Sequence, residues 1–156
     1  MMPEMIILVG NIGTGKSTKA LEYARKGYVV INADAITTMI GGGDYTLYDE
    51  KKKPIYKDAE FCITKDSFIY GFDVVIDNTN MSRKTRARHI SHAIYHEKTI
   101  KVIDFGKGDE KSLARRLSNP KGISEAQWRS VHEKFQREYE KPELSEGIDY
   151  IEDMTE

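Results

Sequence analysis

The sequence predicts an α/β fold with a central parallel sheet of four to five strands and helices on both faces of the sheet. Two observations lead to this prediction. Strand-like and helix-like patterns alternate along the whole chain of 156 residues, and such chains form parallel strands joined by right-handed helical crossovers. An unbroken apolar run at residues 5–9 also leads directly into a glycine-rich stretch, and a short apolar run of this kind is typical of a buried strand.

Each expected strand is a short apolar run, and each expected helix has an apolar face or a recognisable start or stop signal. The strands are expected at residues 5–9, 28–31, 74–76, 99–105 and 148–151. The helices are expected at residues 17–26, 35–40, 54–70, 82–96, 109–117 and 124–141. The polar stretch at residues 44–53 is expected to be a surface segment.

Turn and capping residues support the limits of these helices. Gly27 and Gly71 follow the first and third helices, where glycine is a common C-terminal stop. Three further residues can cap the N-termini of the last three helices: Ser82, Asp109 and Ser124.

The composition indicates a globular protein that forms a single domain over residues 1–156. Hydrophobic residues make up 39% and charged residues 31%, and the net charge of −1 gives no general attraction to nucleic acid. The single cysteine, Cys62, excludes an internal disulfide and fits a reducing compartment. No apolar run approaches the ~20 residues that span a bilayer, so we expect a cytoplasmic protein without membrane contact.

The strongest motif is a phosphate-binding loop. Residues 10–17, GNIGTGKS, fit G-x-x-x-x-G-K-[ST] without a mismatch. The glycines keep side chains away from a bound polyphosphate, and the backbone amides and the following helix N-terminus point at the anion. Lys16 would reach the β- and γ-phosphates and Ser17 would bind Mg²⁺. We expect these residues to bind the nucleotide: Gly10, Asn11, Gly13, Thr14, Gly15, Lys16, Ser17 and Thr18.

Acidic residues follow the second and third strands, and ligands of parallel sheets bind beyond the carboxyl ends of the strands. Asp34 would orient and deprotonate an attacking hydroxyl; alternatively, it only caps the helix that begins at Ala35. Asp77 is a candidate Mg²⁺ ligand beside Ser17, unless Asn78 is the group that faces the site.

Other polar residues are candidates for contacts to a second substrate. Asn78, Thr79 and Asn80 could bind it or could fix the turn after the third strand. Four cations in the stretch 83–88 oppose the dipole of the helix that they begin, which a phosphate ligand would explain. Arg86 is the one expected to face inward and bind that ligand, with at least Lys84 and Arg88 on a solvated face.

Arginines also occur in residues 109–123, which we expect to form a small helical lid. Arg115 and Arg116 precede a loop at residues 118–123. Arginine side chains that reach over the phosphates from a lid would stabilise charge in the transition state. Simple salt bridges within the lid are the alternative.

Taken together, the motifs GNIGTGKST, NADA, VVIDNTN followed by Arg and Lys, and ARRLSNPKG resemble the 5′-kinase domain of phage polynucleotide kinases and related bacterial end-healing kinases. The resemblance runs from about residue 5 to residue 139. It implies a P-loop NTPase-type three-layer α/β/α fold, with ATP and Mg²⁺ bound by Lys16 and Ser17. It also implies that Asp34 is the general base for the 5′-hydroxyl and that Arg116 contacts the donor phosphate.

The resemblance places Asp77, Asn78 and Asn80 near the acceptor. Two positions depart from it: Ala33 and Thr37 stand where some members of that group carry arginines that grip the acceptor phosphate.

We therefore expect an ATP-dependent kinase with Lys16, Asp34 and Arg116 as its catalytic residues. The favoured acceptor is the 5′-OH end of DNA or RNA, in bacterial or phage-infected host cytoplasm. Two alternatives stay open, a small-molecule kinase that acts on a nucleoside, nucleotide or sugar, and an NTP-binding switch protein. The oligomeric state is open as well.

Overall fold

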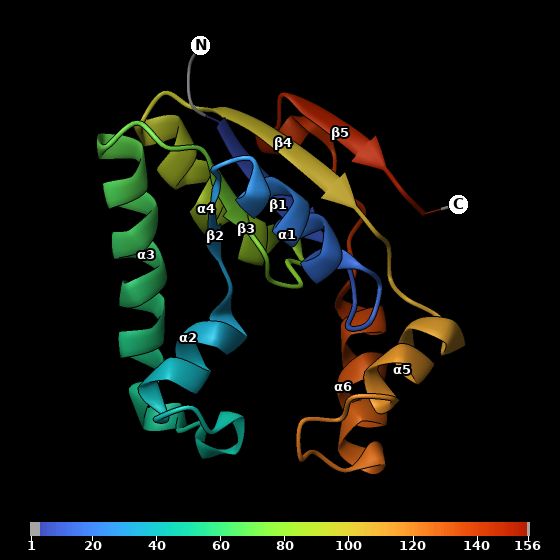
Figure 1. Cartoon of the computed structure of the whole chain (residues 1–156). Coiled ribbons are helices and arrows are strands. Elements are labelled where there is room, and N and C mark those ends of the chain that lie inside the picture. The colour runs from blue at the N-terminus through green and yellow to red at the C-terminus, as the bar shows by residue number, and fades with distance from the viewer. Residues whose placement is uncertain (1–3, 156) are drawn as a thin grey trace.

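The computed structural model describes residues 4–155, and its centre is a five-stranded parallel sheet in the order β2-β3-β1-β4-β5 (Figure 1). The central strand pairs with β3 on one side and β4 on the other. Residues 5–9 of this strand are fully buried, which explains their unbroken apolar run. The strands are β1 (Glu4–Val9), β2 (Val29–Ile31), β3 (Val74–Ile76), β4 (Thr99–Asp104) and β5 (Tyr150–Asp153).

Helices connect these strands, and most of their predicted limits agree with the structure to within a few residues. Ser82, Asp109 and Ser124 cap the last three α-helices with side-chain hydrogen bonds, as predicted. The α-helices are α1 (Lys16–Arg25), α2 (Ala33–Ile40), α3 (Lys53–Ile69), α4 (Arg83–Tyr95), α5 (Glu110–Leu117) and α6 (Glu125–Glu138). Within residues 4–155 there are also short 3₁₀ turns, η1 (Tyr45–Leu47), η2 (Glu50–Lys52) and η3 (Leu144–Glu146).

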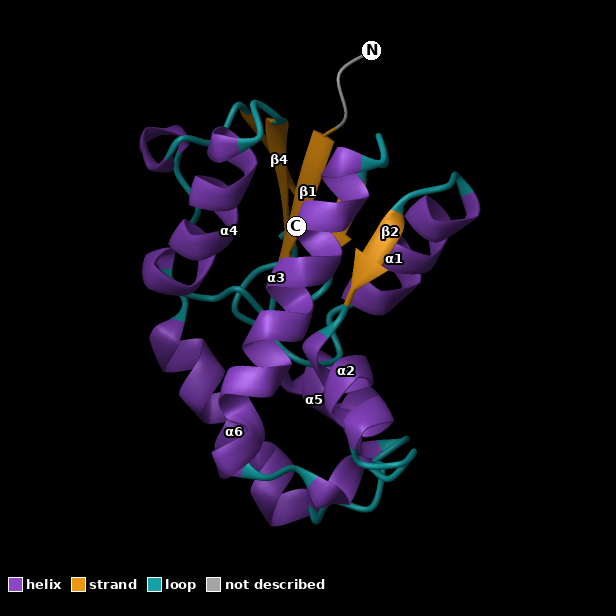
Figure 2. Ribbon diagram, turned by 90° about the vertical axis from the view of Figure 1, so that its left-hand side faces the viewer, coloured by secondary structure: helices purple, strands orange, loops and turns teal. Residues whose placement is uncertain are grey.

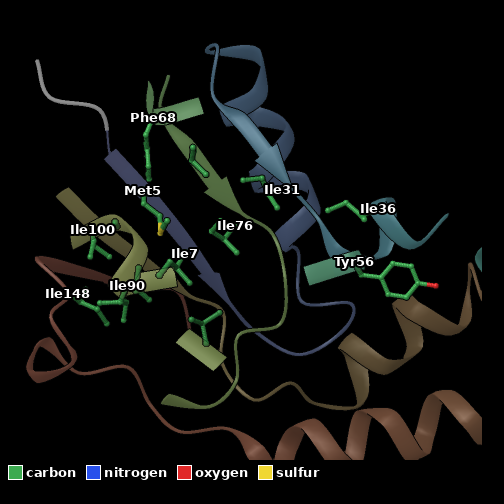
Figure 3. Close-up of a cluster of buried hydrophobic side chains, with 14 residues drawn as sticks. Met5, Ile7, Ile31, Ile36, Tyr56, Phe68, Ile76, Ile90, Ile100 and Ile148 are labelled. Carbon is green, nitrogen blue, oxygen red and sulfur yellow. The ribbon is translucent and has the colours of Figure 1, made fainter. Parts of the chain in front are cut away.

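The sheet lies between two layers of helices, which confirms the predicted α/β/α arrangement (Figures 1 and 2). Side chains of β1 alternate between the two faces. Ile6 and Leu8 pack with Ala20 of α1, whereas Met5 and Ile7 belong to a larger cluster with residues of α3 and α4. Figure 3 shows that this cluster extends from β1 to α2 and the beginning of α3.

The helices α5 and α6 lie beyond the carboxyl edge of the sheet, opposite α2 (Figure 1). They pack together around a separate apolar cluster of Ile12, Leu113 and Trp128. Because Ile12 belongs to the glycine-rich loop, this cluster fixes both helices against that loop. None of the helices within residues 4–155 has both the length and the apolar composition needed to cross a bilayer.

One expectation fails inside the fold. Arg86 faces inward, but it is completely buried and binds the protein itself. Its guanidinium donates to both carboxylate oxygens of Glu146, at 2.9 and 3.1 Å, and to the backbone carbonyls of Asn80 and Met81. These acceptors occupy the donors that a phosphate would need, so Arg86 does not fit the predicted role as a substrate ligand.

We expect Arg86→Met to lower the free energy of unfolding by about 3 kcal/mol, because Glu146 would stay buried without its partner. Chemical denaturation measures this loss. The double variant Arg86→Met/Glu146→Leu should recover much of it, since it leaves no unpaired charge. Unchanged stability together with weaker acceptor binding would contradict the structural role.

Candidate active site

A cavity of 550 Å³ opens at the carboxyl ends of β1, β2 and β3. Its walls come from separate parts of the chain, as expected for a parallel sheet. They are residues 12–18 after β1, residues 32–34 after β2 and residues 77–79 after β3. The helices α5 and α6 complete the cavity with Arg115, Arg116 and Trp128, among others.

The glycine-rich loop is shaped by glycines that admit no side chain. Gly13 and Gly15 have φ angles of 72° and 104°, which favour glycine. A Cβ atom on Gly13 would lie 1.9 Å from the carbonyl oxygen of Ser112 in α5, and one on Gly10 would lie 2.8 Å from the Thr14 hydroxyl. A loop of this shape, at the N-terminus of α1, fits a polyphosphate.

Asn11 holds this loop against α6 and the segment that follows β4. Its side chain is fully buried and donates to the backbone carbonyls of Lys107 and His132, both at 2.9 Å. Asn11 and Gly10 do not line the cavity. The Asn11 side chain therefore holds the loop in place and does not fit the predicted role as a direct contact to the nucleotide.

Lys16 is the buried cation of the cavity. Its Nζ donates to the backbone carbonyl of Asn11 at 2.7 Å. Burial is the main cause that lowers the pKa of Lys16 to about 8; the charge of Arg116 acts in the same direction, and those of Asp77 and Asp34 oppose it. The negative charge of a polyanionic ligand would compensate the positive charge of this desolvated ammonium group.

Asp77, not Asn78, faces the loop serine. Ser17 Oγ donates to Asp77 Oδ2 at 3.3 Å, and Asn32 Nδ2 donates to the same oxygen at 3.0 Å. Burial raises the pKa of Asp77, and the bond from Asn32 and the charge of Lys16 oppose this shift. Asn78 also lines the cavity, but its side chain is held by other parts of the chain: its Oδ1 accepts from the backbone amide of Ala33 at 2.8 Å, and its Nδ2 donates to Glu60 at 2.6 Å.

The Ser17 and Asp77 oxygens are suited to Mg²⁺. Within residues 4–155 no three His, Cys, Asp or Glu side chains gather as a metal site. An ion here would therefore use one carboxylate, the serine hydroxyl and phosphate oxygens, which is a usual set of ligands for Mg²⁺.

Asp34 is an exposed residue in the first turn of α2. The N-cap of α2 is Asn32, whose Oδ1 accepts from Ala35 N at 2.8 Å, so the alternative that Asp34 only caps this helix is wrong. Tyr45 of η1 lies close to the Asp34 carboxylate. Burial raises the pKa of Tyr45 to about 12, and the Asp34 charge adds to the shift.

Asp34 also lines a second cavity, of 460 Å³, between α2, η1 and α3. The residues Ala33, Asp34 and Tyr45 belong to both cavities. The carboxylate thus lies at the junction of the two spaces.

Arg116 reaches the first cavity from α5. Its guanidinium carbon lies 5.0 Å from the centroid of the Trp128 ring, and its buried Nε has no hydrogen-bond partner within the described part of the chain. An unsatisfied buried cationic donor is costly, and a bound anion would satisfy it. The neighbouring Arg115 donates to the Gly13 carbonyl at 3.3 Å and so holds the loop.

The structure separates the last two predicted substrate contacts, Thr79 and Asn80. Thr79 lines the first cavity, and its carbonyl accepts from Gly10 N at 2.9 Å. Asn80 is buried with a φ of 49°, lines neither cavity, and donates to the carbonyls of Leu8 and Asn78. Asn80 therefore fixes the turn after β3, which was the alternative to a substrate contact.

The sheet order, the loop after β1 and the arginine-bearing helix beside that loop define a kinase-like P-loop domain. The family can be stated as well: residues 5–142 match the model of AAA_33, described as an AAA domain, and the chain belongs to that family. A comparison with curated proteins finds no match in sequence.

Solved structures with the same fold come from proteins of different kinds. A chain of the Pnkp1/Rnl/Hen1 RNA repair complex has a TM-score of 0.71 and 22% identity, over 87% of this chain and 45% of that one. A fungal RNA kinase has a TM-score of 0.65 and 16% identity, over 98% and 38%. The APS kinase CysC of Mycobacterium tuberculosis, in complex with AMPPNP and APS, has a TM-score of 0.66 and 12% identity, over 99% and 90%.

This chain spans less than half the length of the RNA repair and RNA kinase chains that it matches. At these identities the likeness is one of fold, and that fold is shared by RNA kinases and small-molecule kinases.

Proposed function

We propose that this protein is an ATP-dependent kinase that phosphorylates the 5′-hydroxyl of a polynucleotide. The observation that carries the proposal is the position of Asp34 between two cavities. One cavity has the residues of a nucleotide site, and the other offers room for an acceptor on the far side of the carboxylate. A switch protein that only hydrolyses its nucleotide would need no such second space.

In this proposal the first cavity binds ATP with Mg²⁺, and residues 13–18 bind the phosphates. The bound Mg²⁺–ATP supplies the γ-phosphoryl group and accepts the leaving charge on ADP. Lys16 exchanges the Asn11 carbonyl for phosphate oxygens, and Ser17 and Asp77 hold the metal ion.

Asp34 accepts the proton of the acceptor hydroxyl while the hydroxyl oxygen forms its bond to phosphorus. Arg116 lies on the opposite wall, where its guanidinium, whose buried Nε has no partner within residues 4–155, meets the negative charge of the moving phosphoryl group.

Two observations support a polynucleotide as the acceptor. The NADA and DNTN segments resemble those of polynucleotide 5′-kinases and supply the residues that surround Asp34. An RNA repair complex and an RNA kinase are also among the proteins with this fold. The rival is a small-molecule kinase, which the size of the second cavity and the likeness to APS kinase favour.

An acceptor panel with labelled ATP tests the proposal. We expect 5′-OH DNA or RNA oligonucleotides to be labelled with a kcat/KM about tenfold or more above that of any nucleoside or sugar, because a polynucleotide makes contacts beyond its reacting sugar. Oligonucleotides that already carry a 5′-phosphate are the control and should stay unlabelled.

Label confined to nucleosides, mononucleotides or sugars would favour the small-molecule kinase. Hydrolysis of ATP without label in any acceptor would favour the switch protein.

A further inference from the structure

The second cavity has walls of different chemistry. Its α2 wall consists of Ala33, Asp34 and Thr37 and contains no cation. Its cations come from the opposite wall, Lys53 and Lys57 on α3 and Arg88 on α4. Any anionic group of an acceptor whose hydroxyl lies at Asp34 would therefore turn toward α3.

The three cations are not equally available. Arg88 donates to Glu60 at 3.2 Å, a buried carboxylate that also accepts from Asn78. Lys53 lies 3.5 Å from Glu50, and both side chains are exposed. Lys57 makes no salt bridge within residues 4–155 and acts on the Glu50 carboxylate only at longer range, so a ligand would displace no ion-pair partner from its ammonium group.

Lys53 and Lys57 are four residues apart on α3. Side chains at this spacing lie on the same face of a helix, one turn apart. Two ammonium groups on one face can bind the same phosphate as point charges. The cavity thus presents two ammonium groups from one face of α3, and within residues 4–155 only Lys53 has a salt-bridge partner.

The same cavity has an aromatic surface. Tyr56 is buried, and the ring centroid of Tyr48 lies 5.6 Å from that of Tyr56. Tyr48 is 50% exposed and lines the cavity. An exposed tyrosine beside cations is typical of surfaces that stack a nucleic-acid base while they bind its backbone.

We propose that the second cavity is a nucleotide-recognition subsite in which Lys57, assisted by Lys53, binds a phosphate of the acceptor and Tyr48 stacks on its base. The reacting hydroxyl of the same nucleotide lies at Asp34. The inference rests on the proposed function and adds which residues distinguish a phosphate-bearing acceptor from a neutral nucleoside or sugar.

The test is a binding measurement that does not depend on catalysis. Isothermal titration compares 5′-deoxyadenosine 3′-monophosphate with 5′-deoxyadenosine, two analogues without a reacting hydroxyl, in the presence of a non-hydrolysable ATP analogue and Mg²⁺. We expect the unmodified protein to bind the phosphorylated analogue about tenfold more tightly, as a charge-assisted contact at an exposed site predicts.

Three variants separate the contributions. Lys57→Gln should remove the preference for the phosphorylated analogue, and Lys57→Arg should retain it. Lys52→Gln is the matched control, because Lys52 is exposed nearby and does not line the cavity; it should bind both analogues as the unmodified protein does. Tyr48→Leu should weaken both analogues alike, by about fivefold or more.

The inference is overturned if the unmodified protein shows no preference for the phosphorylated analogue, or if Lys57→Gln and Lys52→Gln behave alike. The proposed function fails by a different result, the absence of label in 5′-OH oligonucleotides in the acceptor panel. The two failures are therefore distinguishable.

Discussion

Asp34→Asn is expected to slow phosphoryl transfer about 10³-fold and to leave the affinity for ATP within about twofold, because the loss is that of a general base. The amide has the shape of the carboxylate but cannot accept the proton of the acceptor hydroxyl. Single-turnover labelling of a 5′-OH oligonucleotide measures the rate, and titration with ATP in the presence of Mg²⁺ measures the affinity.

The structure makes this substitution a clean test. Asp34 is exposed, and α2 is capped by Asn32, so the helix does not depend on the Asp34 carboxylate. Asp58→Asn on α3 is a matched control, since it removes an exposed carboxylate that lines neither cavity. Equal losses of binding and transfer, or no loss of either, would remove Asp34 from the role of base.

The part of the site that the sequence predicts well is the part set by local backbone rules. Residues 10–17 form a loop between a buried strand and a helix, and the motif specifies which positions tolerate no side chain. The rule for parallel sheets then brings Asp34 and Asp77 to the same edge. Both steps use sequence patterns that extend over only a few residues.

The predicted contacts that fail are polar residues whose partners are distant in sequence. Arg86 binds Glu146, which is 60 residues away, and Asn11 binds His132, 121 residues away. In the sequence, a polar residue beside a phosphate-binding loop looks the same whether its side chain binds a ligand or another segment of the chain. Only the packing of η3 beside α4 and of α6 beside the glycine-rich loop distinguishes the two cases.

The second cavity was not predicted, because it depends on how residues 44–53 pack against α3. That segment reads as a polar surface stretch, yet its Tyr45 lies beside Asp34 and its Tyr48 lines the cavity. The available signal was the occurrence of two tyrosines close to a run of lysines. Ala33 and Thr37 of α2 stand where some members of the resembled group carry arginines, and the cations of this cavity lie on α3 and α4 instead.

Lys16→Met is expected to weaken ATP binding and phosphoryl transfer together, each by about 100-fold, because a charge-assisted contact to the phosphates is lost. Methionine keeps most of the buried aliphatic volume and removes the ammonium. Titration with ATP and single-turnover labelling provide the two measurements. An unaffected transfer rate would contradict the assignment of the donor site.

The same substitution should raise the stability of the nucleotide-free protein. Burial lowers the pKa of Lys16 from 10.5 to about 8, so the folded state binds this proton more weakly than the unfolded state. The charged lysine therefore destabilises the fold by about 3 kcal/mol at neutral pH, and this penalty is relieved as the pH rises from about 8 to 10.5. Denaturation of the unmodified protein and Lys16→Met across this range should show the difference shrinking with pH.

The pKa of Lys16 also predicts how ATP affinity depends on pH. In the free protein Lys16 loses its proton above about pH 8, whereas phosphates beside it stabilise the charged form. ATP binding must then take up a proton. Above about pH 8 the affinity for ATP should therefore decrease with pH, with a limiting slope of about tenfold per pH unit. Lys16→Met should lack this dependence and serves as the control. An unmodified protein whose affinity stays constant across the same range would show that Lys16 does not bind the phosphates as a cation.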